Sequence, residues 1–529
     1  PNGLPDGVID SFDTPESDGA LGLALSDLQV ALVLMKPIVA AGQPAATRSY
    51  YAVSASGNVE LVGVEGLTIA ARRLSIEVNG ASDSAAAAGT NVPVVDFTKL
   101  SGGKLAVATG PATSVDITFA DRVLRATGLL TLTIQEYVHV SGSFAFEKGT
   151  DLTNVKLTDN STMARASLLK VGASNVYAFA GVGGPYWQDN SGPNGIPDGL
   201  IDENDAPLST GAMGVVLRNL SFALALVKEL PATGPPTSGS TPSKPRSFYA
   251  LKGSGAVSLV GLDDFQVSAQ SLTLEVNGGT MQNPPVTGAP AIQLQTTDFD
   301  SATAGIQPLV VRTGSKPTDT VTLDFTKPVL RVTGYLTLSI SEYVFLSGAF
   351  AFEKGETLTS VKLSDGTTVG SLSTLKIGAS SLYGFVGLRG PYWVIDQSTG
   401  VPTVRAPRDG ESADAVGLAL SDVSVAVALL KELPQGMGAS TALRSFYAVK
   451  ATGSVSLVGI DDVFLEATGI SIEVNGGPVT VNGQKVVDFG KLSGGGLTIP
   501  TGPSSSQLIS YSTPLLRASG RVAFGVAGV

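Results

Sequence analysis

Cysteine is absent from this sequence, and histidine occurs once, at His139. The lack of cysteine excludes disulfides, thiolate catalysis and cysteine-bound zinc sites. Charged residues make up only 15% of the chain and the net charge is −11, so the clustered Lys and Arg that bind nucleic acid are missing. No apolar run approaches the roughly 18–20 residues of a membrane-spanning helix. We therefore expect neither a nucleic-acid partner nor a membrane span.

Internal repetition dominates what is present. The phrase "GLALSDLQVALVLMK" begins at Gly22 and returns in altered form at Gly214 and at Gly417, so the spacings are 192 and 203 residues. Phrases of the types "RSFYAV", "IEVNG" and "LRATG" recur three times in the same order. A period of this length indicates an array of similar structural copies. We predict an acidic linker over 1–19, a first copy over 20–211, a second over 212–414 and an incomplete third over 415–529.

Two further phrases occur only twice, "FAFEKG" and "GPYW", and both are missing from the third copy. The opening string "PNGLPDGVID" also returns, as "PNGIPDGLID" from Pro193 to Asp202. We therefore expect the chain to be a segment of a longer array.

Alternation with a period of two marks the segments inside each copy. In "LRATGLLTLTI", from Leu124, alternate residues are small or apolar, and Thr, Val, Ile and aromatic residues are frequent. This pattern favours β-strands over helices. We predict an all-β fold of tandem copies of about 190–200 residues. Solenoid-like stacking of short strands is preferred, because the segments resemble one another and "NG" hairpin turns are few. The alternative is a string of β-sandwich modules.

The acidic stretch "DNSGPNGIPDGLIDEND", Asp189 to Asp205, is the strongest candidate for metal chemistry. Ca²⁺ prefers six to eight oxygen ligands, which alternating Asp and Asn side chains around a Gly turn supply. The stretch resembles the acidic calcium loops of thrombospondin type 3 repeats. The third copy has lost the pattern, and the alternative is a polar connector without metal. The candidate ligands are Asn194, Asp198, Asp202, Asp189 and Asp205, with Asn2, Asp6 and Asp10 in the first loop.

Other polar residues have simpler explanations. His139 corresponds to Phe345 in the next copy, which favours an ordinary strand position. Glu147 and Glu353 recur in "FEKG", as expected for charges on a solvated face. The only tryptophans, Trp187 and Trp393, each close a "PYW" and are expected to pack at the end of a core. No nucleotide loop, catalytic triad or zinc signature is present. We therefore expect no enzymatic activity.

The phrases "SGSFAFEKG", "SLVGI" and "ISIEVNGG" are similar to the tandem repeats of giant secreted bacterial surface and adhesin-like proteins. The nonapeptide calcium repeat found in some of them is absent. The resemblance implies an extracellular or cell-surface structural segment, such as a filament, stalk, matrix or surface layer, stabilised by calcium. Its partners would be neighbouring repeats or other copies of the chain. The alternative function is an adhesin whose variable loops bind a cell-surface glycan.

Overall fold

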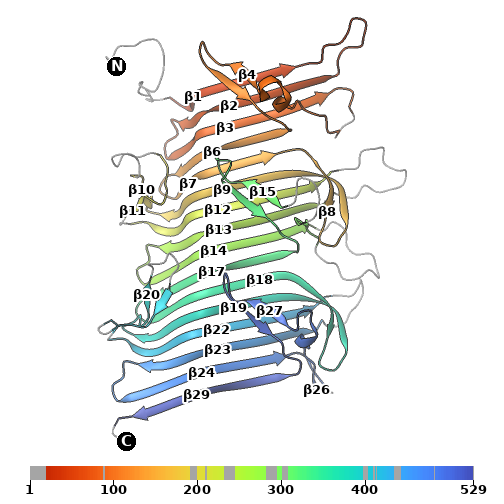
Figure 1. The fold of residues 1–529 in the computed structure, drawn as a ribbon. Coiled ribbons are helices and arrows are strands. Elements are labelled where there is room, and N and C mark those ends of the chain that lie inside the picture. Colours follow the sequence, from red (N-terminus) through yellow and green to blue (C-terminus); the bar gives the residue numbers. More distant parts are fainter. Residues whose placement is uncertain are drawn as a thin grey trace. The chain divides into compact units, whose positions relative to one another are not determined.

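The computed structural model describes residues 20–86, 90–190, 199–208, 211–230, 245–280, 295–300, 308–396, 403–408, 411–412, 414–433, 443–481 and 483–527. The described chain is all-β, as predicted, with three short 3-10 helices as its only named helical elements. Seventeen of the strands take part in extended antiparallel sheet (Figure 1). Within the described residues, no helix has the length and apolar character that a membrane crossing requires.

The chain divides into two compact units. Unit 1 combines Pro1–Leu251 with Thr297–Thr326, and unit 2 combines Lys252–Thr296 with Lys327–Val529. Strand β13 (Ser247–Val260) contains the point of division. A compact unit is therefore not the same as a copy of the sequence repeat, because each unit holds strands from two copies.

The sheet of unit 1 is a meander in which each long strand pairs with the next. The short strand β8 pairs with the start of β9. The strands, in order, are β1 (Gly22–Met35), β2 (Arg48–Val62), β3 (Leu67–Asp83), β6 (Val123–Ile134), β7 (Val138–Lys148), β8 (Leu152–Lys156), β9 (Thr162–Val182) and β12 (Met213–Glu229).

Unit 2 repeats this meander. Its strand β18 is continuous, whereas the corresponding part of unit 1 is divided into the two strands β7 and β8. The strands are β14 (Phe265–Thr280), β17 (Val329–Ile340), β18 (Val344–Lys362), β19 (Thr368–Leu388), β22 (Val416–Glu432), β23 (Ser445–Val458), β24 (Val463–Gly476) and β29 (Leu515–Val526).

The structure shows neither of the two predicted architectures. The long described strands belong to one large sheet, whereas a β-sandwich packs two sheets face to face. The pairing direction counts against the solenoid. Every register observed among the described strands is antiparallel, whereas the rungs of a parallel β-helix stack in parallel. The similar segments of about fifteen residues are therefore neighbouring strands of a meander and do not form solenoid rungs.

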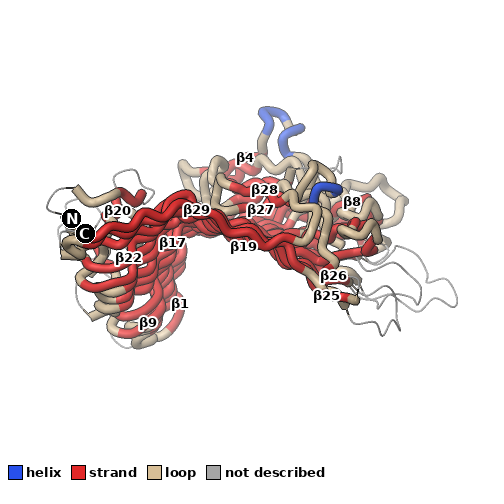
Figure 2. Tube along the Cα trace, turned by 90° about the horizontal axis from the view of Figure 1, so that it is seen from below, coloured by secondary structure: helices blue, strands red, loops and turns tan. Residues whose placement is uncertain are grey.

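Short hairpins and 3-10 turns complete each unit. One hairpin from each copy lies against the long strands, and Figure 2 shows β27 and β28 on one face of the sheet that contains β19. The hairpins are β4 (Leu105–Ala108) with β5 (Ser114–Ile117), β15 (Leu309–Arg312) with β16 (Thr320–Leu323), and β27 (Leu497–Pro500) with β28 (Ser506–Ile509). Smaller pairs are β10 (Trp187–Gln188) with β11 (Ala206–Pro207), β20 (Val394–Asp396) with β21 (Thr403–Arg405), and β25 (Val479–Thr480) with β26 (Gly483–Gln484). The 3-10 turns are η1 (Phe97–Lys99), η2 (Ser101–Gly103) and η4 (Phe489–Lys491).

A β-bulge interrupts the first strand of each copy at the same place. Asp27, Asn219 and Asp422 have φ values of 53°, 49° and 48°, and the registers of β1, β12 and β22 shift around them. Asp and Asn tolerate this left-handed conformation better than other non-glycine residues. In β12 and β22 the bulge moves the buried positions onto the other parity, so the buried residues before and after it lie on the same face of the strand.

The hairpin of each later copy packs on strands of two copies. Strand β15 contacts β9 and β12, and β27 contacts β19 and β22. The backbone approach is so close that only glycine fits beneath it. A Cβ on Gly172 would lie 2.1 Å from the Arg312 carbonyl oxygen, and one on Gly378 would lie 2.0 Å from the Pro500 carbonyl oxygen.

A buried asparagine from each "VNG" phrase fixes the stems of the same hairpin. Asn79 donates to the carbonyls of Val95 and Asp121 at 2.9 and 3.0 Å. Asn475 does the same to Val487 and Thr513 at 3.2 and 3.0 Å. Both asparagines are almost fully buried, so their removal would leave backbone carbonyls without donors.

Gly378→Ala should loosen the hairpin of unit 2, because the new methyl group has to displace backbone. We expect a loss of about 1–3 kcal/mol in the free energy of unfolding, the range for overpacked sites. Urea unfolding and hydrogen exchange at the amides of β27 would measure it. Gly525→Ala is the matched control, since no atom lies within 4 Å of its added Cβ. Equal effects of the two substitutions would contradict the packing argument.

Candidate functional site

Charged residues from four neighbouring strands of unit 2 form a single row, here called the charge row. Glu275 on β14 lies opposite Arg331 on β17, Arg331 opposite Glu353 on β18, and Glu353 opposite Lys376 on β19. The sign of the charge alternates from strand to strand. Directly opposite pairs of unlike charge stabilise an antiparallel sheet.

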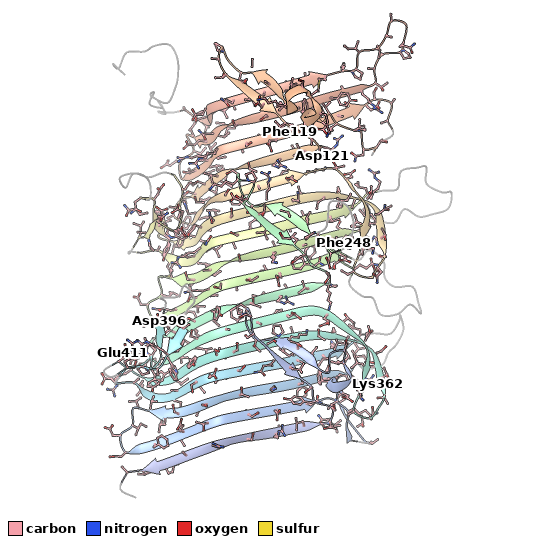
Figure 3. All side chains as sticks on the ribbon, in the orientation of Figure 1. Phe119, Asp121, Phe248, Lys362, Asp396 and Glu411 are labelled. Atoms are coloured by element: carbon pink, nitrogen blue, oxygen red, sulfur yellow. The ribbon has the colours of Figure 1, made fainter. Side chains whose placement is uncertain are left out.

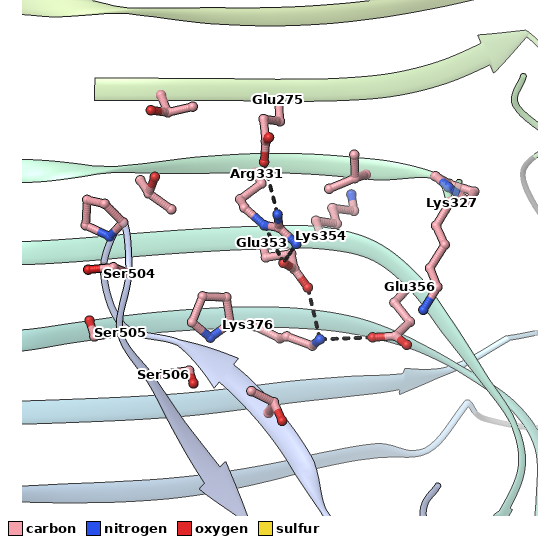
Figure 4. A pocket seen from close by; sticks show the side chains of 18 residues that line it. Glu275, Lys327, Arg331, Glu353, Lys354, Glu356, Lys376, Ser504, Ser505 and Ser506 are labelled. Carbon is pink, nitrogen blue, oxygen red and sulfur yellow. Dashed lines mark hydrogen bonds and ion pairs between the residues drawn. The ribbon is translucent and has the colours of Figure 1, made fainter. Parts of the chain in front are cut away.

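The ion pairs of the charge row are short and share partners (Figure 4). Arg331 reaches Glu275 at 3.0 Å through Nη1 and donates through Nε to Glu353 at 2.7 Å. Lys376 donates to Glu353 and to Glu356, in both cases at 2.9 Å. The Lys376 side chain is only 7% exposed, so the row ends in a cation that depends on two carboxylates.

The electrostatics of the row keep Glu353 and Lys376 ionised. Burial alone would raise the pKa of Glu353, but the hydrogen bonds and charges of Lys376 and Arg331 outweigh it and hold the pKa below its usual value. Burial alone would likewise lower the pKa of Lys376, but Glu356 and Glu353 outweigh it and raise the pKa. Both oxygens of Glu353 accept from cations of neighbouring strands, Arg331 and Lys376, so the row ties β17, β18 and β19 together.

A pocket of about 640 Å³ lies between the charge row and the loop that joins β27 to β28. The loop contributes Gly502, Ser504 and Ser505, and the sheet contributes the charged side chains (Figure 4). Ser380 on β19 holds the loop in place, with its hydroxyl 3.1 Å from the Thr501 carbonyl oxygen and 2.8 Å from the Ser505 hydroxyl. The lining combines charged and hydroxyl side chains with proline and valine, and it includes no aromatic side chain.

The same row recurs in unit 1. Glu77, Arg125, Glu147 and Lys170 lie opposite one another on β3, β6, β7 and β9. Arg125 reaches Glu77 at 2.7 Å and Glu147 at 2.9 Å, and Lys170 pairs with Glu147. Burial would raise the pKa of Glu147, but Lys170 and Arg125 lower it. Recurrence in both units indicates a structural role.

The acidic loop is described only in part. Asn194 and Asp198, and also Asn2, Asp6 and Asp10, lie outside the described residues. The other three predicted ligands, Asp189, Asp202 and Asp205, lie in the segment that connects β10 to β11. The described residues contain no group of three or more His, Asp or Glu side chains that could hold a metal ion. Calcium binding by this loop therefore stays a prediction.

The described carboxylates of the loop accept hydrogen bonds from backbone. Buried Asp205 accepts from the amides of Asn190 at 2.9 Å and Asp202 at 2.8 Å. Asp189 accepts from the amide of Gly199 at 2.8 Å. These bonds fold the loop back on itself.

In unit 2, the segment that corresponds to this acidic loop is held by an ion pair instead. Arg405 on β21 donates to Glu411 through two nitrogens, at 2.6 and 2.9 Å, and the Arg408 amide adds a bond of 2.8 Å. The hydrogen bond from Arg405 is the main cause that lowers the pKa of Glu411 to about 2. Figure 3 places Glu411 and Asp396 in the same region of the unit. At the end of the second copy, a salt bridge therefore stands where the first copy has the acidic pattern.

The remaining candidates occupy ordinary structural positions. His139 lies on β7 with its Nδ1 3.0 Å from the Thr133 hydroxyl, and burial lowers its pKa. Trp187 and Trp393 are buried, as predicted. The indole of Trp393 donates to the Gly384 carbonyl at 2.8 Å and packs edge-on against Tyr383.

No known protein-family model matches the chain, and no curated protein matches it with significance. The assignment of function therefore rests on the geometry. The sequence argument missed the two most informative residues of the site, Lys376 and the buried Asn475. Both stand in phrases that recur between copies, which was the signal available for them.

Glu353→Gln should weaken unit 2 and change its pH dependence. The folded pKa of Glu353 lies below the unfolded value near 4.5, so its contribution is present above about pH 4.5 and is lost as the pH falls. We expect a cost of about 1–3 kcal/mol at pH 7, below the value for a fully buried pair. The variant should also lose less stability than the parent between pH 5 and pH 3.

Urea unfolding at several pH values would measure both effects. Glu342→Gln is the control, because it removes the same charge from an exposed turn next to the same strand. An equal loss at both positions would show that the charge row contributes nothing specific.

Asp205→Ala should destabilise unit 1 whether or not calcium is present, because two backbone amides lose their acceptor. The expected cost is about 1–3 kcal/mol. Glu203→Ala removes an equal charge from an exposed neighbour and serves as control. Thermal melts in EDTA and in millimolar Ca²⁺ would separate the two roles of the loop. A calcium-induced rise in Tm that disappears in Asp205→Ala would support the calcium prediction, and melts unaffected by Ca²⁺ would contradict it.

Proposed function

We propose that the chain is a structural segment of an extracellular or cell-surface repeat protein, serving in a filament, stalk, matrix or surface layer. The observation that carries the proposal is the joint between copies. The last long strand of one copy pairs with the first strand of the next, β9 with β12 and β19 with β22. Successive copies therefore extend one antiparallel sheet edge to edge, and this extension is the form of stacking we propose.

The joint is as extensive as the pairing inside a copy. The pairing of β19 with β22 runs from Leu372 opposite Glu432 to Leu388 opposite Val416. The register is interrupted only between Ala379 and Gly384 of β19, and the strands pair regularly on both sides of this irregularity. A flexible linker between independent modules would be exposed, polar and poor in such contacts.

A shared hydrophobic core supports the joint. The core beneath the hairpin of unit 2 combines Val361 and Leu372 of the second copy with Leu430, Phe489 and Ile499 of the third. Each large apolar side chain buried in this way contributes about 1.5–3 kcal/mol. Separation of the copies would expose this surface, so the joint resists both thermal opening and pulling.

The similarity of the repeat phrases to those of giant secreted bacterial proteins supports the proposed location. Calcium, if bound by the acidic loop, would add to the first joint only, because the second has the Arg405–Glu411 pair. The adhesin alternative depends on variable loops outside the described residues. The described pocket lacks an aromatic ring on which a sugar would stack.

The mechanical role can be tested with an engineered disulfide that joins two copies. Ser380 of the second copy and Ser505 of the third have their hydroxyls 2.8 Å apart, and the chain has no cysteine of its own. In Ser380→Cys/Ser505→Cys, oxidation should join the hairpin to β19. Pulling single molecules by their ends should give discrete unfolding events in the reduced protein. Oxidation should shorten the length released, because residues between the two positions stay tied.

The reduced form of the same protein is the control for the effect of the disulfide. Smooth extension of the reduced chain without discrete unfolding events would overturn the structural function.

A further inference from the structure

The long strands of unit 2 form a sheet whose two faces are covered differently. The hairpin β27–β28 packs on one face, over a core that includes Ala426, Ala428 and Leu430 of β22. The pair β20–β21 lies on the same face, beside Phe345 of β18. On the opposite face, no described segment of unit 2 packs on the middle part of the strands (Figure 2).

Apolar side chains fill this opposite face, here called the open face. Two ladders of directly opposed residues cross it through β17, β18, β19, β22 and β23. Neither ladder contains a charged or hydrogen-bonding side chain. The first ladder is Val332, Phe352, Ile377, Val427 and Val449, and the second is Gly334, Phe350, Ala379, Val425 and Ala451.

The open face is exposed in the interior of the sheet. Ile377 on β19 and Leu429 on β22 are each 41% exposed, and Val386 on β19 is 54% exposed. Both strands pair with a long strand on each side, so this exposure does not come from a sheet edge. The face also continues across the joint between copies, where Ile377 lies opposite Val427. An extended apolar surface of this kind is typical of a binding site.

The two ends of the open face carry opposite charges. Lys431 lies on this face at the end of β22, where it is exposed and has no ion-pair partner among the described residues. The neighbouring Glu432 is tied to Arg444. At the other end of the strands, the turns carry the exposed carboxylates of Glu342 and Asp462. An anionic group is therefore attracted to the lysine end and repelled from the other end.

Unit 1 has the same arrangement on β12. Leu226 and Lys228 occupy the positions that Leu429 and Lys431 have on β22. Leu226 is 39% exposed, and the exposed Lys228 has no ion-pair partner in the described part of the chain. The need for a buried core does not explain this pattern, because neither leucine is buried.

The side chains of the open face suit acyl chains better than a protein surface. Protein interfaces carry about one hydrogen bond per 100–200 Å² and are surrounded by a polar rim. The two ladders have no side chain that could make such bonds. An acyl chain needs apolar contact alone, and its binding is favourable in proportion to the apolar area removed from water. The unpaired Lys431 adds a charge that complements an acidic headgroup.

We propose that the open face of unit 2 binds the acyl chains of single anionic lipid molecules, with the acidic headgroup beside Lys431. The chains lie against the ladders, in contact with Phe352, Ile377 and Val427. Lipid binding is a function separate from the mechanical role proposed above and does not depend on it.

Parinarate, a fluorescent fatty-acid anion, tests the proposal on the 529-residue chain. Its emission should rise and saturate as protein is added, because its chain leaves water. Ile377→Asp should weaken binding about ten-fold, which corresponds to about 1.4 kcal/mol, because it places a charge beneath the acyl chain. Leu508→Asp is the matched control, since Leu508 is 46% exposed but lies on β28, on the hairpin side. Circular dichroism would verify that both variants fold.

Displacement of parinarate by palmitate and by hexadecanol tests the position of the headgroup. Lys431→Gln should weaken the binding of palmitate about two- to five-fold, the effect of one exposed ion pair, and should leave hexadecanol unchanged. Lys491→Gln removes the same charge from η4, on the hairpin side, and should change neither.

Four results would overturn the proposal. The first is a parent chain that shows no saturable binding of parinarate. The second is an equal loss of binding in Ile377→Asp and Leu508→Asp. The third is binding to phosphatidylglycerol vesicles without binding of parinarate, which would assign the face to a bilayer surface. The fourth is a dimer that Ile377→Asp dissociates and parinarate does not, which would assign the face to a second copy of the chain.

Discussion

The placement of each hairpin on the sheet beneath it is the contact on which the rest of the structure depends. The hairpin covers the strands on both sides of the boundary between copies, and its close approach is possible because Gly172 and Gly378 have no side chain. Without this cover, the apolar faces of β9, β12, β19 and β22 would be open to water. The hairpin therefore turns an edge-to-edge strand contact into a closed hydrophobic core.

Two sets of polar side chains lie at opposite ends of the hairpin. The buried asparagines such as Asn475 hold its stems against the strand ends, and the charge row lies under its tip. The charge row also specifies register. A shift of one residue would move Arg331 away from both of its glutamates, so a wrong pairing loses ion pairs as well as apolar burial.

The local features of this fold can be predicted well from the sequence. Alternation identified the strands, and the recurring Asx residue in "SDL", "RNL" and "SDV" marks a left-handed bulge position. The direction of strand pairing could not be predicted from the sequence, because residues alternate in the same way in a meander and in a solenoid rung. The partners of Asn79 lie far along the chain, at Val95 and Asp121, so spacing alone did not reveal them. Glu353 looked like a surface charge, because its cations come from other strands and meet it only after bulges set the register.

The mismatch between sequence copies and compact units has a consequence for how such a gene can change in length. A recombination that adds or removes one full period, wherever its breakpoints fall, still gives every hairpin a preceding sheet end on which to lie. The number of copies can therefore vary without redesign of any joint. A single copy produced alone and cut at the sequence boundaries is different, because a hairpin such as β27–β28 would then lack β19, one of the two long strands on which it lies.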